Sequence, residues 1–87
     1  MYVILVYDVE AKRCGKMLKL CRRYLTWIQN STLEGEITAV KLKELLLLAQ
    51  DFIDPSTDSI IVFKSKTKKW MEKQIVGVEK MSTDNFF

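Results

Sequence analysis

Hydrophobic residues first occur in an unbroken run and then recur at helical spacing. Met1 to Tyr7 are apolar, mostly β-branched or aromatic, and too few for a buried helix, so they predict a central β-strand. From Ala11 onward the apolar side chains recur at every third or fourth position, which predicts an amphipathic helix over residues 11–24. This apolar stripe consists of Cys14, Met17, Leu18, Cys21, Tyr24 and Leu25.

The middle of the chain predicts a hairpin followed by a second helix. Residues 25–38 contain two short strand-like stretches joined at Asn30-Ser31, and both of these residues are common in turns. Thr38 has a side chain suited to cap a second helix, whose apolar positions continue at helical spacing as far as Ile53. We expect this helix to end before Asp54-Pro55, because proline disfavours helical geometry in the residue that precedes it.

The remaining segments complete the order βαββαβ. Ser59 to Lys64 predicts a strong strand, and part of residues 70–76 predicts a further one. Two helices on one face of an antiparallel sheet make an α+β fold, the ferredoxin-like sandwich, here with an additional C-terminal strand. We expect this domain over residues 1–78, and a tail or strand over residues 79–87 that docks on a partner protomer or protein. The face without helices predicts a homodimer paired through the sheet.

Length and composition restrict the classes of function. A chain of 87 residues has no room for a second domain or a deep private cavity, which favours sites shared between protomers. No stretch approaches the ~20 apolar residues that a membrane span requires, and the opening run lacks a basic leader and a small-residue cleavage site. We therefore expect a cytoplasmic protein with no membrane partner.

The side-chain inventory restricts the chemistry further. The chain contains no histidine, which excludes histidine-dependent acid–base or nucleophilic catalysis within it. Its two cysteines, Cys14 and Cys21, form no Cys-x-x-Cys pair, and we expect them to be reduced core residues rather than zinc ligands. Any catalysis must use carboxylates, a metal ion or both.

Positive charge is concentrated in the first helix. The net charge is only +3, but six basic residues and no acidic residue lie between Glu10 and Glu34. Such a concentration is typical of proteins that bind polyanions, although an ordinary solvated helix face remains the alternative. Four of the basic residues fall on one stripe at helical spacing: Lys12, Lys16, Lys19 and Arg23.

Four features together resemble a known family. They are the first strand ending in Tyr7-Asp8-Val9, the basic first helix, the segment from Trp27 to Gly35, and the terminal Asp84-Asn85-Phe86-Phe87. In order and spacing they resemble the small CRISPR-associated protein two, a dimeric ferredoxin-like component of the spacer-acquisition machinery. The resemblance covers nearly the whole chain.

The resemblance implies a partner set and a catalytic residue. It implies a homodimer that binds DNA and bridges dimers of the larger CRISPR integrase, with metal-dependent nuclease activity in some members. The family's aspartate at the end of strand one matches Asp8, which would be both catalytic residue and metal ligand for Mg²⁺ or Mn²⁺, shared between protomers. Read from the residues alone, Asp8 could instead cap the first helix, and we expect Glu10 to be a surface or capping residue.

Basic residues near Asp8 are the candidates for phosphate contact. The resemblance assigns this role to Arg13 and Lys16, and the helix stripe adds Lys12, Lys19 and Arg23 to the predicted nucleic-acid-binding set. A second cluster, Lys64, Lys66, Lys68 and Lys69, could extend that surface or be a solvated turn.

The chain also departs from the family pattern. Trp27 and Leu33 stand where many members have arginine and phenylalanine, which weakens the catalytic interpretation more than the scaffold interpretation. We expect Trp27 to be a core or interface residue, and Gly35 to permit a β-bulge.

Three hypotheses therefore follow. The leading one is a dimeric DNA-binding scaffold for the integrase. The second is a Mg²⁺-dependent endonuclease acting on RNA or double-stranded DNA. The third is a toxin-like metal-dependent endoribonuclease, or a ferredoxin-like regulatory module that binds no nucleic acid.

Overall fold

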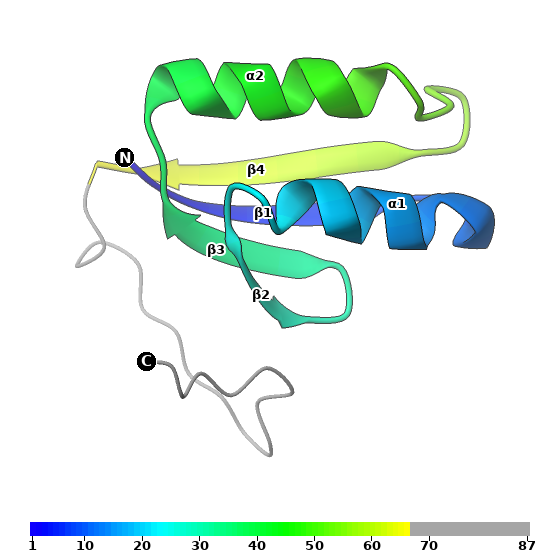
Figure 1. The fold of residues 1–87 in the computed structure, drawn as a ribbon, viewed down its shortest axis with the longest axis horizontal. Helices are drawn as coiled ribbons and strands as arrows, with labels where there is room; N and C mark the ends of the chain where they lie inside the picture. The colour runs from blue at the N-terminus through cyan, green and yellow to red at the C-terminus, as the bar shows by residue number, and fades with distance from the viewer. Residues whose placement is uncertain (67–87) are drawn as a thin grey trace.

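Strand β1 (Tyr2–Asp8) is an inner strand of a four-stranded antiparallel sheet with the order β2-β3-β1-β4 (Figure 1). The structure is a computed structural model that describes residues 1–66. The other strands are β2 (Thr26–Gln29), β3 (Thr32–Glu36) and β4 (Ser59–Ser65). The chain order βαββαβ and the antiparallel sheet confirm the predicted α+β architecture.

The two helices cover one face of this sheet. Helix α1 (Ala11–Cys21) and helix α2 (Ala39–Gln50) pack beside each other and on alternate residues of the strands. In β1 the residues on this face are Val3, Leu5 and Tyr7, all of them buried, because successive strand residues point to opposite faces. The same cluster includes Met17 and Leu45 of the helices, which are fully buried.

Local capping and turn residues position the second helix and the hairpin as the sequence predicts. The Thr38 hydroxyl accepts a hydrogen bond of 3.1 Å from the backbone N–H of Lys41, which satisfies a donor at the start of α2. Asn30 occupies the hairpin turn with φ of 45°, a left-handed conformation that asparagine tolerates better than most residues.

Both helices end earlier than their apolar patterns suggest. Helix α1 ends at Cys21 rather than Tyr24, since the chain tightens into a turn in which the N–H of Arg23 donates to the carbonyl of Leu20. The apolar stripe continues through this turn because Tyr24 still packs against the core. Phe52 likewise packs against the core from the turn that follows α2.

The β-bulge expected at Gly35 is not where the sheet is irregular. The irregularity lies in β2, between Trp27 and Gln29, whereas β3 pairs with β1 in unbroken register through Gly35. The predicted strand within residues 70–76 and the tail over residues 79–87 lie outside the described residues. Neither helix of the described part is long and apolar enough to cross a membrane.

Candidate nucleic-acid and metal site

Asp8 is the last residue of β1 and is exposed. It pairs with Ser59 of β4, two positions beyond the pair formed by Val6 and Ile61. Because side chains alternate along a strand, Asp8 lies on the sheet face opposite the helices. The carboxylate predicted to be catalytic therefore stands at one end of the face that the helices leave uncovered.

That face, which we call the open face, is apolar at its centre. Ile61 and Phe63 of β4 are 52% and 55% exposed, and they pair with Val6 and Ile4 of β1. The neighbouring β4 residues Ile60 and Val62 pack instead against the core on the helix side. Large exposed apolar side chains on one sheet face are typical of an interaction surface.

Asp8 does not cap α1. The helix begins at Ala11, its capping position is Glu10, and no side chain makes a capping hydrogen bond there. Glu10 instead forms salt bridges, with its carboxylate 3.0 Å from Nη2 of Arg13 and 3.9 Å from Nζ of Lys12. Asp8 takes part in no salt bridge with residues 1–66, so its carboxylate is available for another ligand.

The donor set partly fits a divalent metal ion. Mg²⁺ prefers oxygen ligands, keeps several waters, and is held in many sites by one or two carboxylates together with a phosphate. Asp8 supplies one exposed carboxylate of this kind. Within residues 1–66 no group of three or more acidic, cysteine or histidine side chains could hold a metal. A complete site would therefore need ligands in addition to those of residues 1–66 of one chain, such as a second carboxylate or a phosphate.

Asp58 is a functional candidate that the sequence reasoning missed, since it lies in a stretch interpreted only as the exit turn of the second helix. Its side chain is fully buried at the base of β4 and accepts a bond of 2.6 Å from Nε of Arg13. Its two oxygens also accept hydrogen bonds from the backbone N–H groups of Glu10 and Asp54, at 3.1 and 3.0 Å, and from the Thr57 hydroxyl. Chiefly because of the Arg13 guanidinium, the pKa of Asp58 lies well below its usual range.

Arg13 is occupied by these contacts. Its side chain is 15% exposed, with Nε bound to Asp58 and Nη2 bound to Glu10. Asp58 raises the pKa of Arg13, which remains charged in any case. Arg13 thus connects the start of α1 with the loop before β4, and its predicted contact with phosphate stays a prediction.

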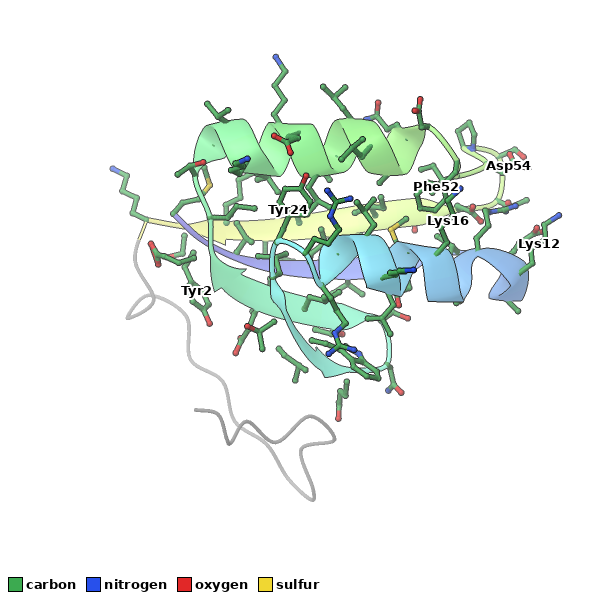
Figure 2. All side chains as sticks on the ribbon, viewed as in Figure 1. Tyr2, Lys12, Lys16, Tyr24, Phe52 and Asp54 are labelled. Atoms are coloured by element: carbon green, nitrogen blue, oxygen red, sulfur yellow. The ribbon has the colours of Figure 1, made fainter. Side chains whose placement is uncertain are left out.

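The other predicted basic residues are exposed along α1. Lys12, Lys16 and Lys19 fall within an arc of about 60° at 3.6 residues per turn, and Arg23 lies beyond the end of α1, in the turn that follows it. Figure 2 shows Lys16 beside Phe52, and its ammonium lies 4.7 Å from the centre of that ring. A groove of about 440 Å³ between the helices is lined by Lys16, Lys19, Leu20, Arg23, Leu48, Asp51 and Phe52. Three cations and one carboxylate on this groove leave it net positive.

The residues that depart from the family pattern have packing roles. Leu33 is fully buried, and Trp27 is partly buried against the core with its indole N–H donating 2.9 Å to the carbonyl of Asn30. Cys21 lies in the core, where burial raises the pKa of its thiol to about 11. Of the second basic cluster, Lys64 and Lys66 are exposed, and the other two lysines lie outside the described residues.

Comparison with known proteins decides the family. A family model described as "CRISPR associated protein Cas2" matches residues 1–73 of the chain. The chain belongs to the Cas2 family. The resemblance predicted from the sequence is thereby confirmed.

Curated relatives support the same assignment over nearly the full length. The chain is 49% identical over 80 residues to the CRISPR-associated endoribonuclease Cas2 of Dictyoglomus turgidum, which covers 92% of each chain. It is 41% identical over 91 residues to the protein of the same name from Fusobacterium nucleatum, which covers 99% of this chain and 86% of the relative.

Solved Cas2 structures share the fold. One, described as the crystal structure of Cas2, superposes with a TM-score of 0.83 at 36% identity and covers 92% of this chain and 90% of the other. The structure of Streptococcus pyogenes Cas2 at pH 6.5 superposes with a TM-score of 0.75 at 28% identity, covering 87% of this chain and 100% of the other.

Proposed function

We propose that this Cas2-family chain is a cytoplasmic, homodimeric nucleic-acid-binding protein that serves as a scaffold for the CRISPR integrase during spacer acquisition. One observation carries the proposal: Asp8 and the exposed apolar residues Ile61 and Phe63 share the open face of the sheet. Pairing two copies through this face would bury the apolar side chains. It would also bring the two Asp8 carboxylates toward a common axis.

A dimer would cover the open face and the outer strand β4. A two-fold interface uses the same patch on both partners, so each exposed side chain of β4 would meet its equivalent or a neighbour. Among residues 1–66, β4 is an outer strand of the sheet that pairs with β1, and the outer edges of sheets are commonly covered by an added strand. We assign this task to the segment over residues 79–87, which would dock on the partner protomer or on the integrase.

Nucleic acid would be bound through phosphates. The exposed stripe on α1, Lys12, Lys16, Lys19 and Arg23, provides positive charge without base-reading geometry, which suits DNA of any sequence and also RNA. Two-fold symmetry would align two such stripes along one duplex. The predicted role of Arg13 would be a phosphate contact at the end of the same helix.

A charge-reversal experiment tests the binding surface. We expect Lys16→Glu to weaken binding to a duplex, and to lower the slope of log K against log salt by about 1 per protomer for a lost phosphate contact. Lys43→Glu is the matched control, since Lys43 is an exposed lysine of α2 outside the stripe. Fluorescence anisotropy between about 50 and 200 mM salt measures both. Equal losses in the two variants would remove the stripe from the proposal.

A second candidate function is metal-dependent cleavage of RNA or double-stranded DNA, favoured by the exposed carboxylate of Asp8. When bound, Mg²⁺ or Mn²⁺ would supply a water of lowered pKa and neutralise charge on the phosphate. Asp8 from each protomer would hold the ion. No histidine is needed for this chemistry.

Substitution of Asp8 separates the two functions. Asp8→Asn should abolish cleavage in Mg²⁺ or Mn²⁺ while it leaves the dimer and duplex binding intact. Glu36→Gln is the control, because Glu36 is an exposed carboxylate at the other end of the sheet. Cleavage that persists in Asp8→Asn contradicts the nuclease candidate, and failure to co-purify with the integrase favours a toxin-like endoribonuclease or regulatory module over the scaffold.

A further inference from the structure

Two aspartates flank the junction of β1 and β4 and have opposite environments. Asp8 is exposed, whereas the Asp58 side chain has no exposed surface. The two are neighbours across the sheet, since Asp8 pairs with Ser59, the residue after Asp58. Figure 2 shows Lys12, at the start of α1, and Asp54, in the loop before β4, at this same end of the molecule.

We infer that Asp58 is a positioning residue, which through Arg13 and the Glu10 amide fixes the direction in which Asp8 presents its carboxylate. The inference rests on the proposed metal-dependent cleavage, in which Asp8 touches the ion and Asp58 touches neither ion nor nucleic acid. It also assigns Arg13 the role of holding the connection between β1 and α1.

The connection between β1 and α1 is short and depends on Asp58. Only Val9 and Glu10 lie between the end of the strand and the start of the helix. The Asp58 carboxylate accepts the N–H of Glu10 at 3.1 Å on Oδ1 and Nε of Arg13 at 2.6 Å on Oδ2. The backbone after Asp8 is therefore held by one buried carboxylate, while the ladder pair with Ser59 holds the backbone of Asp8 itself.

The same carboxylate is itself held firmly. Oδ2 accepts the N–H of Asp54 at 3.0 Å, and the Thr57 hydroxyl lies 3.1 Å from Oδ1. In Asp58→Asn one of the two oxygens becomes an amide nitrogen, which cannot accept a hydrogen bond, so either the Arg13 guanidinium or the Glu10 amide loses its acceptor and the other keeps only a neutral one. If the turn after Asp8 is loosened, the Asp8 carboxylate would sample directions away from a shared metal ion. Substitution of residues that hold a metal ligand in place generally weakens metal binding in this way.

Asp58→Asn tests the inference, with Arg13→Lys as a second variant in case the first fails to fold. Asp54→Asn is the matched control. Asp54 lies in the same loop, and within residues 1–66 its side chain accepts hydrogen bonds from the N–H and the hydroxyl of Ser56, contacts that asparagine can keep. We expect Asp58→Asn to lower kcat and to raise the half-saturating Mn²⁺ concentration by about 10–100-fold. KM and metal-free duplex affinity should stay within about twofold, since the α1 stripe is unchanged.

Hydrogen exchange gives a readout that does not depend on cleavage. Loss of the charged acceptor should speed exchange of the Glu10 amide by about tenfold or more, while the Leu5 amide in the centre of β1 keeps its protection. In Asp54→Asn the Glu10 amide should exchange as in the unchanged chain. The double variant Asp58→Asn/Arg13→Lys should lose little more than either single variant, as expected for groups that act together.

The outcomes separate this inference from the proposed function. A fall in kcat that only follows the folded fraction, with the Mn²⁺ dependence and the Glu10 exchange unchanged, overturns the positioning role and leaves the cleavage proposal standing. Persistent cleavage in Asp8→Asn overturns the cleavage proposal. In that case, faster exchange at Glu10 in Asp58→Asn would support only the statement that Asp58 holds the turn after Asp8.

Discussion

The two faces of β1 differ in what covers them. On the helix side, Val3, Leu5 and Tyr7 are buried beneath α1 and α2. On the open face, the strand ends in the exposed Asp8 and is flanked by the exposed β4 residues Ile61 and Phe63. The covered face holds the domain together, whereas no helix of residues 1–66 covers the open face, where Ile61 and Phe63 are exposed. The difference indicates that stability and association are carried by alternate residues of the same strands.

Truncating the covered face should have the largest effect on stability. Leu45 is fully buried between α2 and the sheet, so Leu45→Ala should lower the free energy of unfolding by about 2–5 kcal/mol. Val40→Ala, at a residue of the same helix that is 76% exposed, should change it by less than about 0.5 kcal/mol. Urea denaturation at fixed protein concentration measures both. Similar losses would contradict the assignment of the covered face as the core.

Charging the open face should act on association instead. Ile61→Asp should raise the dimer dissociation constant by more than about tenfold, since two-fold pairing places the buried charge on both partners. Val40→Asp adds the same charge to an exposed apolar position of α2 and should leave association unchanged. Sedimentation velocity over a range of concentrations distinguishes them. Equal dissociation constants for the two variants would show that the dimer forms elsewhere.

The contribution of Asp58 to stability should depend on pH. The pKa of Asp58 is lower in the folded chain than its ordinary value of about 4, because Arg13 stabilises the charged form. Its contribution is therefore full above about pH 4 and is lost as the pH falls toward the folded-state pKa. Asp58→Asn should be less stable than the unchanged chain at pH 7, and the difference should shrink on acidification. Urea denaturation between about pH 7 and 2 measures this, and parallel curves would contradict it.

Removal of the Thr38 cap of α2 should have the smallest effect on stability. Thr38→Ala removes the hydroxyl that accepts the N–H of Lys41 and should cost about 1 kcal/mol of unfolding free energy. Thr38→Ser keeps the oxygen and should recover most of the loss. Thermal unfolding monitored by circular dichroism provides the comparison. A serine variant as unstable as the alanine variant would show that packing of the threonine methyl, rather than capping, is responsible.

Most of the architecture was predictable because its signals are local. The apolar, β-branched run of β4, the Asn30-Ser31 turn and the Thr38 cap each depend on residues within a few positions of one another. Helix ends were less predictable, since Tyr24 and Phe52 continue the apolar pattern from turns that lie beyond the helices. Asp8 is exposed, and its alternative as a helix cap was wrong because the helix begins after Glu10.

The contacts of Asp58 had no signal in the linear pattern. It is 45 positions from Arg13 and 48 from Glu10, and an acidic residue in a loop after proline is ordinarily solvated. Arg13 was grouped with the phosphate-binding residues because of the family resemblance, and nothing nearby in the chain indicated a buried partner. Only the folding of the loop before β4 against the start of α1 brings the two charges together.

By itself, the order of apolar and polar residues determined the succession of strands and helices and, for the helices, the side that faces inward, because a period of about 3.6 places apolar residues on one stripe. The unbroken apolar runs of β1 and β4 left the inward side of those strands to the tertiary structure. It also determined that positive charge follows one stripe of the first helix. The tertiary structure decided which charges meet: it left Asp8 exposed and surrounded Asp58 with donors. Burial makes that difference, because a carboxylate removed from water must gain partners from distant parts of the chain, whereas an exposed one keeps its water.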